Sequence, residues 1–365
     1  MIRYKEGRSD GKYGCFLEEC HEKLSDGYEK LTDTILKHKK IAIPLLYVIL
    51  IAIPFLGPSQ YFIRVLCLIG VYSILTLSLN LIAGYMGQTS MGHAALYCLG
   101  GYFSALLGSN LGMPFWITIF FGILGGALGG LILGLSTMRL SGSYLAVITL
   151  AFAEVVEMVI LNWNDVTNGP LGVRNIPRPE IFGIELTTAN GGFYWLIIVL
   201  VTISVLVSMC VVNSKFGRAV RAIKEDELAA KLMGVHTAAY KVKTIVLSGA
   251  MAGLAGAFYA SMNRYIDANT FNFDVSMTIL CIVIFGGLGS IPGMIIGSTL
   301  LIAFPEVLRS LADYRFVVYG LLLIFMMRFR SQGLLGGLSK KPYKLPKGVQ
   351  RPGEQDKASL GKQVK

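Results

Sequence analysis

Charged residues are scarce in this sequence of 365 residues, because Asp, Glu, Lys and Arg together make up only 15% of it. Hydrophobic residues make up 54%, and the mean hydropathy is +0.60. A soluble chain of this length needs more charge to cover its surface, so the composition argues against a water-soluble protein of one or two domains. It indicates a membrane protein.

Residues for catalysis and metal binding are also few. Among the four histidines and six cysteines, Cys15, Cys20 and His21 could supply three metal ligands, but no fourth ligand is evident and the usual two-residue cysteine spacing is absent. The other cysteines lie within apolar runs, where a thiol packs as a small hydrophobe: Cys67, Cys98, Cys210 and Cys281. We therefore expect no metal site, no cofactor and no catalytic residue in this chain.

A phosphate-binding loop is absent as well. The stretch GQTSMGHAAL, residues 87–96, comes close to the pattern G-x-x-x-x-G-K-[ST], but His93 and Ala94 stand where that loop needs a lysine and a hydroxyl. Long apolar runs flank the stretch, whereas a phosphate loop follows a strand of a soluble sheet. No Walker-type motif occurs elsewhere in the sequence, so an ATP-driven process would need another protein.

What the sequence does contain is ten apolar stretches of about the length needed to cross a bilayer. They lie at about 41–57, 61–83, 92–108, 114–136, 144–161, 193–213, 244–262, 275–290, 292–308 and 316–328. Glycines recur within them at one-turn spacing, as in Gly122, Gly126 and Gly130, or Gly249 and Gly253, which lets helix backbones approach closely. The sequence thus predicts an all-α fold, a polytopic transmembrane helical bundle of about ten spans.

Basic residues flank the apolar stretches and predict their orientation. The run KHKK at 37–40 stands directly before the first span, which indicates a cytoplasmic N-terminus, and ten spans then bring the basic segment 214–243 and the C-terminal tail to the cytoplasmic side. Three regions follow: a cytoplasmic polar extension at 1–40, a transmembrane domain at 41–328 and a basic cytoplasmic tail at 329–365. The net charge of +11 therefore fits a protein of the cytoplasmic membrane, and nucleic acid is not an expected partner.

Two of the predicted spans are interrupted by flexible or helix-breaking residues, at 84–92 and at 286–293. Non-helical backbone at membrane depth survives only where it is buried in protein or lines a water-filled cavity, and such breaks in both halves of a chain point to a transport path. The polar residues near the first break are candidates for lining that path: Asn80, Gln88, Ser90 and His93. Ordinary cytoplasmic turns between helices would give the same pattern, and the sequence does not separate the two interpretations.

Two carboxylates, Glu154 and Glu157, lie within the apolar run at 144–161. An ionisable group in hydrocarbon is costly enough to indicate a function by default. Glu157 is only a turn from the predicted outer end, where it can reach the interface, whereas Glu154 lies deeper. We therefore expect Glu154 to face the interior of the bundle, as a further candidate for the path.

The segment 214–243 predicts a helix outside the membrane that is offered to a cytoplasmic protein, although a loop that only sets topology would also be basic. Its run FGRAVRAIKEDELAAKLMGV, at 216–235, is similar to the coupling loop of the branched-chain amino-acid permeases of ABC importers. Three further stretches are similar to the same family: LNLIAGYMGQTSMGHAA at 79–95, SYLAVITL at 143–150 and FGGLGSIPG at 285–293. The resemblance covers about residues 60–330.

This resemblance implies a permease of the ABC importer type that translocates branched-chain amino acids and does no covalent chemistry itself. It implies as partners a homologous permease in a heterodimer, two cytoplasmic ATP-binding subunits, an extracytoplasmic substrate-binding protein and the lipid bilayer. The residues implied in coupling to the ATPase are Gly217, Arg218, Arg221, Glu225, Asp226, Ala229, Ala230 and Gly234. The broader importer motif has a glutamate where this chain has Leu228, with Glu227 one place earlier, so the individual contacts stay open.

Other classes of function remain to be compared. A secondary transporter or channel needs no cytoplasmic docking helix, so the 216–236 segment argues against that class. A membrane-embedded enzyme needs a catalytic constellation, but among the histidines only His93 adjoins the bundle, with no evident partner. Related permeases carry urea, short amides or other small polar solutes, so the substrate stays open at this point.

Overall fold

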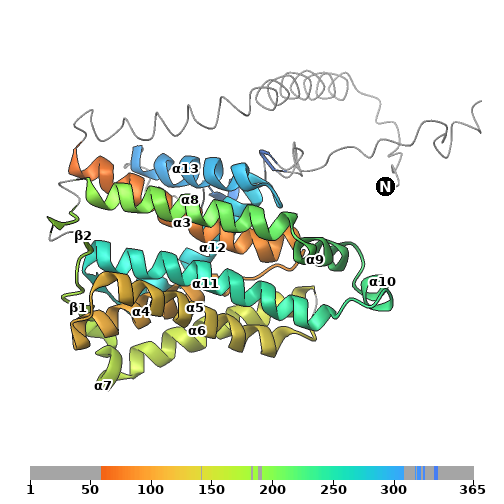
Figure 1. Ribbon diagram of the computed structural model, residues 1–365, viewed down its shortest axis with the longest axis horizontal. Helices are drawn as coiled ribbons and strands as arrows, with labels where there is room; N and C mark the ends of the chain where they lie inside the picture. The colour runs from red at the N-terminus through yellow and green to blue at the C-terminus, as the bar shows by residue number, and fades with distance from the viewer. Residues whose placement is uncertain are drawn as a thin grey trace, which may run out of the picture.

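The computed structural model describes residues 59–307 except 141, 182–183 and 188–190, together with 317, 319–321, 324 and 333–335. Its long helices run roughly side by side along the longest axis of the molecule, as Figure 1 shows. A bilayer imposes this arrangement on apolar segments, because each helix satisfies its own backbone hydrogen bonds where water is absent.

The long helices are α3 (Gln60–Asn80), α4 (His93–Leu111), α5 (Phe115–Thr137), α6 (Ser143–Asn162), α8 (Gly192–Asn213), α11 (Thr237–Asn263), α12 (Phe273–Gly286) and α13 (Ile291–Val307). A five-residue π-helix, η2 (Leu81–Tyr85), continues α3. Two shorter helices, α9 (Lys215–Glu225) and α10 (Glu227–Leu232), lie between α8 and α11.

Eight of the ten predicted spans fall within the described residues, and each of them coincides with one of the long helices. In this part of the chain, six helical stretches are long and apolar enough to cross a membrane: Gln60–Tyr85, Phe115–Thr137, Tyr144–Asn162, Gly192–Asn213, Thr237–Asn263 and Ala268–Gly286. The predicted span at 41–57, and most of the one at 316–328, lie outside the described residues. The number of about ten spans therefore stays a prediction.

Helices α4, α5 and α11 pack against one another at short range. A Cβ atom on Gly126 of α5 would lie 2.2 Å from the carbonyl oxygen of Gly249 in α11, and one on Gly253 would lie 2.3 Å from that of Gly122. A Cβ atom on Gly100 of α4 would lie 2.1 Å from the Cα atom of Gly253. No larger side chain fits at these points, so the predicted close approach of glycine-lined backbones is confirmed.

Helix α3 joins that group to the helices on its other side, through contacts with α11 and with α8, α12 and α13. The hydroxyl groups of Ser73 in α3 and Ser298 in α13 are 2.6 Å apart. Ser248 of α11 donates a hydrogen bond to the carbonyl oxygen of Ser78 at 2.7 Å. Such interhelical hydrogen bonds contribute about 1 kcal/mol each in a membrane protein, so they fix how the helices sit rather than supply most of the stability.

The end of the bundle opposite α9 and α10 carries most of the short elements of the described chain (Figure 1). Those at this end are α7 (Asn164–Thr167), the 3₁₀ helix η3 (Gly169–Leu171), and the strands β1 (Val173–Arg174), β2 (Glu180–Ile181), β3 (Ile184–Glu185) and β4 (Tyr265–Ile266). A second 3₁₀ helix, η4 (Ala268–Phe271), leads from β4 into the bundle, where the Phe271 ring lies 4.8 Å from the Tyr97 ring of α4. Strand β1 pairs with β4 and β2 pairs with β3, both antiparallel. These two-residue strands, which the sequence did not predict, leave the fold otherwise helical.

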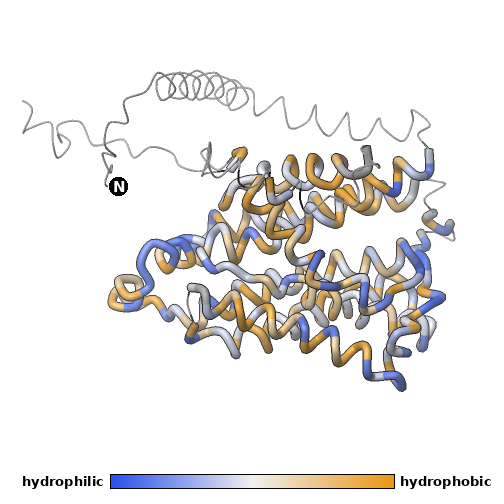
Figure 2. Tube along the Cα trace, turned by 180° about the vertical axis from the view of Figure 1, so that it is seen from behind, coloured by the Kyte–Doolittle hydropathy of each residue, from blue (hydrophilic) through white to orange (hydrophobic). Residues whose placement is uncertain are grey.

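Hydrophilic residues gather at the two ends of the bundle, and hydrophobic residues dominate between them (Figure 2). One polar end holds α9 and α10, and the other holds the short strands (Figure 1). This distribution is that of a protein whose middle lies in hydrocarbon and whose ends lie in water.

Candidate functional site

The chain turns sharply between α8 and α9. The Ser214 hydroxyl oxygen accepts a hydrogen bond from the Gly217 backbone N–H at 3.2 Å, which caps the start of α9. A Cβ atom on Gly217 would lie 2.4 Å from the carbonyl oxygen of Val211, so α9 can fold back onto the end of α8 only with glycine here. Two apolar side chains of α9 itself, Val220 and Ile223, are buried, so this face of the helix is turned toward the bundle.

The predicted coupling segment forms two helices, so the expectation of one helix is wrong at Asp226. This residue has an extended backbone, with φ −156° and ψ 111°. Its carboxylate accepts a hydrogen bond from the Ala229 backbone N–H at 2.9 Å. Asp is among the residues that most favour this N-cap position, because its side chain replaces the backbone acceptor that a helix start lacks. The cap starts α10 in a new direction.

Helix α10 and its C-terminal turn project from the end of the bundle (Figure 1). Gly234, with φ +83°, follows in the left-handed conformation that favours glycine and confirms the predicted helix end. Ala230 is buried and Ala229 is exposed. Three large apolar side chains are exposed here: Leu228 at 68%, Leu232 at 80% and Met233 at 85%. We call these three residues the α10 patch.

The charged residues predicted to dock a partner differ in the contacts that they make within this chain. The Arg221 guanidinium donates a hydrogen bond to a carbonyl at the end of α8 at 3.1 Å and lies 5.5 Å from the centroid of the Tyr85 ring. Arg218 reaches the Asn213 carbonyl only at 3.5 Å. Glu225 is exposed on α9. Arg221 thus ties α9 to the membrane helices, whereas Arg218 and Glu225 lie nearer to solvent.

Two lysines that the sequence did not single out for a contact join this segment to the rest of the chain. The Lys224 ammonium donates a hydrogen bond to the Gly84 carbonyl oxygen in η2 at 2.6 Å. The Lys241 ammonium, which is buried, lies 2.6 Å from the Glu227 carboxylate and 3.5 Å from the Leu140 carbonyl oxygen. A buried ammonium requires such partners. Sequence spacing gave no signal for these pairs, because Lys224 and Gly84 are 140 positions apart.

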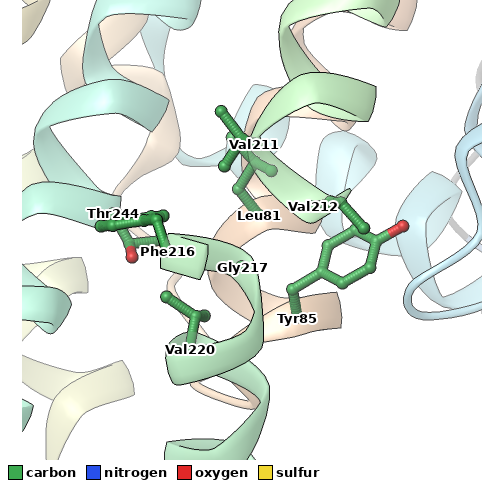
Figure 3. A pocket seen from close by; sticks show the side chains of 8 residues that line it. All are labelled: Leu81, Tyr85, Val211, Val212, Phe216, Gly217, Val220 and Thr244. Atoms are coloured by element: carbon green, nitrogen blue, oxygen red, sulfur yellow. The ribbon is translucent and has the colours of Figure 1, made fainter. Parts of the chain in front are cut away.

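Apolar side chains complete the contact between α9 and the end of α3. Leu81 and Tyr85 of η2 line a narrow pocket together with Phe216 and Val220 of α9, as Figure 3 shows. The Phe216 ring also lies 5.3 Å from the Tyr240 ring at the start of α11. Helix α9 and η2 are therefore in direct contact through both polar and apolar groups.

The first predicted break, at 84–92, begins within η2 and continues at 86–92 as non-helical backbone that is only partly buried: Gln88, Ser90 and Gly92 are buried, whereas Gly87 and Thr89 are exposed. A Cβ atom on Gly92 would lie 2.2 Å from the carbonyl oxygen of Thr149 in α6, so the segment passes close to that helix. The Gln88 Oε1 and Ser90 Oγ atoms are buried and have no hydrogen-bond partner among the described residues. Buried polar atoms without partners are rare in folded proteins, and these two mark the segment as unusual.

Helix α4 begins inside the bundle, at His93. This side chain is fully buried. Its Nε2 atom lies 2.5 Å from the Ser78 Oγ atom, and its Nδ1 atom has no partner among the described residues. The next residue, Ala94, donates its backbone N–H to the Ser276 hydroxyl at 3.0 Å. Ser276 lies in the first turn of α12, so α4 and α12 begin beside one another within the membrane domain.

The two predicted breaks meet at Asn80. Its side-chain oxygen accepts a hydrogen bond from the Gly289 backbone N–H at 2.8 Å, and a Cβ atom on Gly84 would lie 2.5 Å from that same nitrogen. Gly289 belongs to the short turn that joins α12 to α13. Residues 86–92 are thus partly buried non-helical backbone, residues 287–290 are a short turn between α12 and α13, and the two segments are in contact.

Glu154 is exposed on α6, so the expectation that it faces the interior of this bundle is wrong. Val155 and Met158 beside it are each 58% exposed. The physical reason is that α6 packs along one side only, mainly against α4 and α5, and Glu154 falls on the opposite side. Glu157, one turn further on, is partly buried.

Comparison with known proteins gives this arrangement its context. The chain is 33% identical over 339 residues, 87% of its own length and 79% of the relative's, to the high-affinity branched-chain amino acid transport system permease protein LivM of Salmonella typhimurium. It is 32% identical over the same shares to LivM of Escherichia coli K12. The permease protein LivH of Escherichia coli K12 is 27% identical over 73% of this chain and 91% of the relative. No solved structure matches the chain.

The profile of one protein family, described as the permease component of the branched-chain amino acid transport system, matches residues 61–327. This range holds η2, α9, α10 and both breaks. The chain therefore belongs to the family of branched-chain amino acid transport permeases.

Proposed function

We propose that this chain is the membrane-spanning permease subunit of an ABC importer that carries leucine, isoleucine and valine across the cytoplasmic membrane. The family is a transport component and not an enzyme, and its members work within transport systems of several subunits. The observation that carries the proposal is the α9–α10 segment. It projects from one end of a multi-pass helical bundle and donates a hydrogen bond, from Lys224, to Gly84 at the start of the first break.

The partners follow from the same comparison. LivM and LivH are two different permease proteins of branched-chain amino acid transport systems, and this chain is similar to both, which supports pairing with a second, related permease. The exposed side of α6, which carries Glu154, suits coverage by such a subunit, because a carboxylate facing lipid is costly. Of two cytoplasmic ATPase subunits, one would bind the α10 patch of this chain and the other the second permease, and an extracytoplasmic binding protein would deliver substrate at the opposite end.

The orientation that we propose places α9 and α10 in the cytoplasm. Lys215, Arg218 and Lys231 belong to this segment, and basic residues concentrate on the cytoplasmic side of membrane proteins. The opposite end carries both signs of charge, as in the ion pair between Arg178 and Glu185. Both termini then lie in the cytoplasm.

Coupling runs from α10 through α9 into the membrane domain. ATPase subunits that move α10 would also move α9, because only Asp226 separates the two helices. The hydrogen bond from Lys224 to Gly84 and the contact of Arg221 with Tyr85 then transmit the displacement to η2. A π-helix is a strained element that is frequent at functional sites, which suits a part that must change shape between the two states of the transporter.

The substrate path is proposed to pass the start of α4. The candidate path residues lie around this segment: Asn80 directly before η2, Gln88 and Ser90 in the break, and His93 at the start of α4. Gln88, Ser90 and His93 each hold a buried polar atom without a partner among the described residues. Opening of this segment would expose these atoms to water, which gives a physical reason for polar atoms that are unsatisfied when it is closed.

Reconstitution tests the proposal. The chain is assembled with its partner subunits in proteoliposomes, and uptake of labelled leucine is measured with and without ATP and binding protein. We expect uptake only with both, and Gly234→Pro, which removes the left-handed turn after α10, should abolish uptake while the chain still inserts. Leucine uptake by this chain alone without ATP would establish a secondary transporter. Uptake of urea or acetamide in place of leucine would establish the other substrate class.

A further inference from the structure

A polar cavity of about 200 Å³ lies beside the start of α12. Its lining includes Tyr72 of α3, Asn269 of η4, and Asn272, Asp274 and Thr278 at the start of α12. Tyr72 stands halfway along the 26 residues of the membrane-spanning stretch Gln60–Tyr85. The cavity therefore lies near the middle of the membrane, where a polar lining is unusual.

Asp274 brings a carboxylate into this cavity. Among the residues that the structure describes, no cation or hydrogen-bond donor pairs with its side chain, and only its backbone carbonyl is engaged, by the Thr278 hydroxyl at 2.8 Å. A carboxylate in the first turn of a helix gains from the helix dipole, but this gain is smaller than the cost of an ionised side chain at mid-membrane. The helix start alone does not account for an acidic residue at this depth.

Hydrogen-bond donors stand on the same wall of the cavity. The side-chain oxygen of Asn272 accepts a hydrogen bond from the Val275 backbone N–H at 3.4 Å, which turns its amide nitrogen away from the helix as a donor. Asn269 is exposed and carries a second amide. A carboxylate and amide donors side by side match a ligand that carries an ammonium group and a carboxylate on neighbouring atoms.

We propose that this cavity binds the head group of a zwitterionic α-amino acid on the translocation path. Asp274 holds the ammonium group, and the amides of Asn272 and Asn269 hold the carboxylate. These contacts use only the groups that all α-amino acids share, so one site accepts leucine, isoleucine and valine. This inference rests on the proposed function and narrows it, because urea and uncharged amides lack both charged groups.

The test compares single substitutions in the complete complex, reconstituted in proteoliposomes with its binding protein. Asp274→Asn keeps the size of the side chain and removes its charge, and Asp274→Glu keeps the charge. We expect Asp274→Asn to lower ATP-driven leucine uptake about tenfold or more, with Asp274→Glu retaining a larger share. Asp165→Asn is the matched control, because it makes the same change at an exposed site in α7, and it should transport like the unmodified complex.

Assembly of each variant is measured by recovery of all subunits, and coupling by ATP hydrolysis stimulated by the binding protein. An assembled Asp274→Asn complex that takes up leucine at the unmodified rate overturns the site, while the proposed function stands on the uptake by the unmodified complex. If Asp274→Asn fails to assemble, Asn269→Asp decides the matter, because Asn269 is exposed and a carboxylate there would repel that of the substrate. We expect Asn269→Asp to lower uptake severalfold relative to Asn269→Gln, and equal uptake by these two variants overturns the site.

Discussion

Lys224 makes the hydrogen bond that joins α9 to η2 at the end of α3. Its ammonium donates to the Gly84 carbonyl at 2.6 Å, and a Cβ atom on Gly87 would lie 2.8 Å from its Cγ atom, so its aliphatic stem lies close against the start of the break. A hydrogen bond from an ammonium is stronger than one between neutral groups. The same residue thus makes both a polar and a packing contact with the segment that leads to α4.

Removing the charge of Lys224 should uncouple transport from ATP hydrolysis. Lys224→Met keeps the stem and removes the donor, so α9 loses its bond to Gly84 but keeps its packing. We expect ATP-driven leucine uptake by the reconstituted complex to fall about tenfold, with ATP hydrolysis largely retained. Lys215→Met, at the exposed start of the same helix, is the control. Equal uptake in the two variants would contradict the role of Lys224.

Single residues were predicted unevenly from the sequence. Gly234 was predicted to end a helix, and its φ of +83° confirms this, because a glycine after a helical run is a local signal. The expected direction of Glu154 was wrong, since periodicity gives the faces of α6 but not the side on which other helices pack. Lys224 was counted only as one basic residue among many, because its partner lies far away in the sequence.

At the scale of elements, α10 is a short helix that, with its C-terminal turn, exposes three large apolar side chains. Leu228, Leu232 and Met233 are exposed at 68%, 80% and 85%, although this end of the bundle is otherwise hydrophilic (Figure 2). Contiguous exposed apolar side chains mark contact with a partner. In the broader importer motif a glutamate stands where this chain has Leu228, so an apolar contact replaces a charged one at the place where the ATPase subunit is proposed to bind.

The α10 patch should decide recovery of the ATPase subunit. Leu228→Asp places a charge in the proposed apolar contact, and we expect at least about tenfold less ATPase to co-purify with the chain. Leu171→Asp is a matched control, because Leu171 is also 68% exposed but lies in η3 at the other end of the bundle. Recovery is measured by quantitative mass spectrometry after gentle solubilisation. Loss of the ATPase in both variants would indicate general damage instead of a docking surface.

The elements themselves were predicted better than their interruptions. The long helices within the described residues follow from apolar runs and membrane thickness, and each was predicted close to its observed position. The break at Asp226 was missed, since an N-cap inside a helical pattern is hard to distinguish from an exposed acidic residue. The breaks near Gly84 and Gly289 were predicted, but their contact through Asn80 depends on how distant helices pack.

At the scale of the whole molecule, basic connections gather at one end of the described bundle, and a loop that carries both signs of charge lies at the other. The Lys241 ammonium reaches the Leu140 carbonyl, which places the connection after α5, including Arg139, at the same end as α9 and α10. The opposite end holds Arg178 paired with Glu185. The relative placement of these connections thus agrees with the loop charges, because the basic ones share one end and the loop with both signs of charge lies at the other.

Which end faces the cytoplasm can be measured directly. A cysteine introduced as Lys231→Cys lies in α10, and one introduced as Asp165→Cys lies in α7 at the other end; both positions are exposed. In intact cells, a membrane-impermeant maleimide should label Asp165→Cys and spare Lys231→Cys, above the background of the chain's own cysteines. After permeabilisation both should react, which shows that each is accessible. Labelling of Lys231→Cys in intact cells would place α10 outside, and because ATPase subunits work in the cytoplasm, coupling through α9 and Lys224 would then be ruled out.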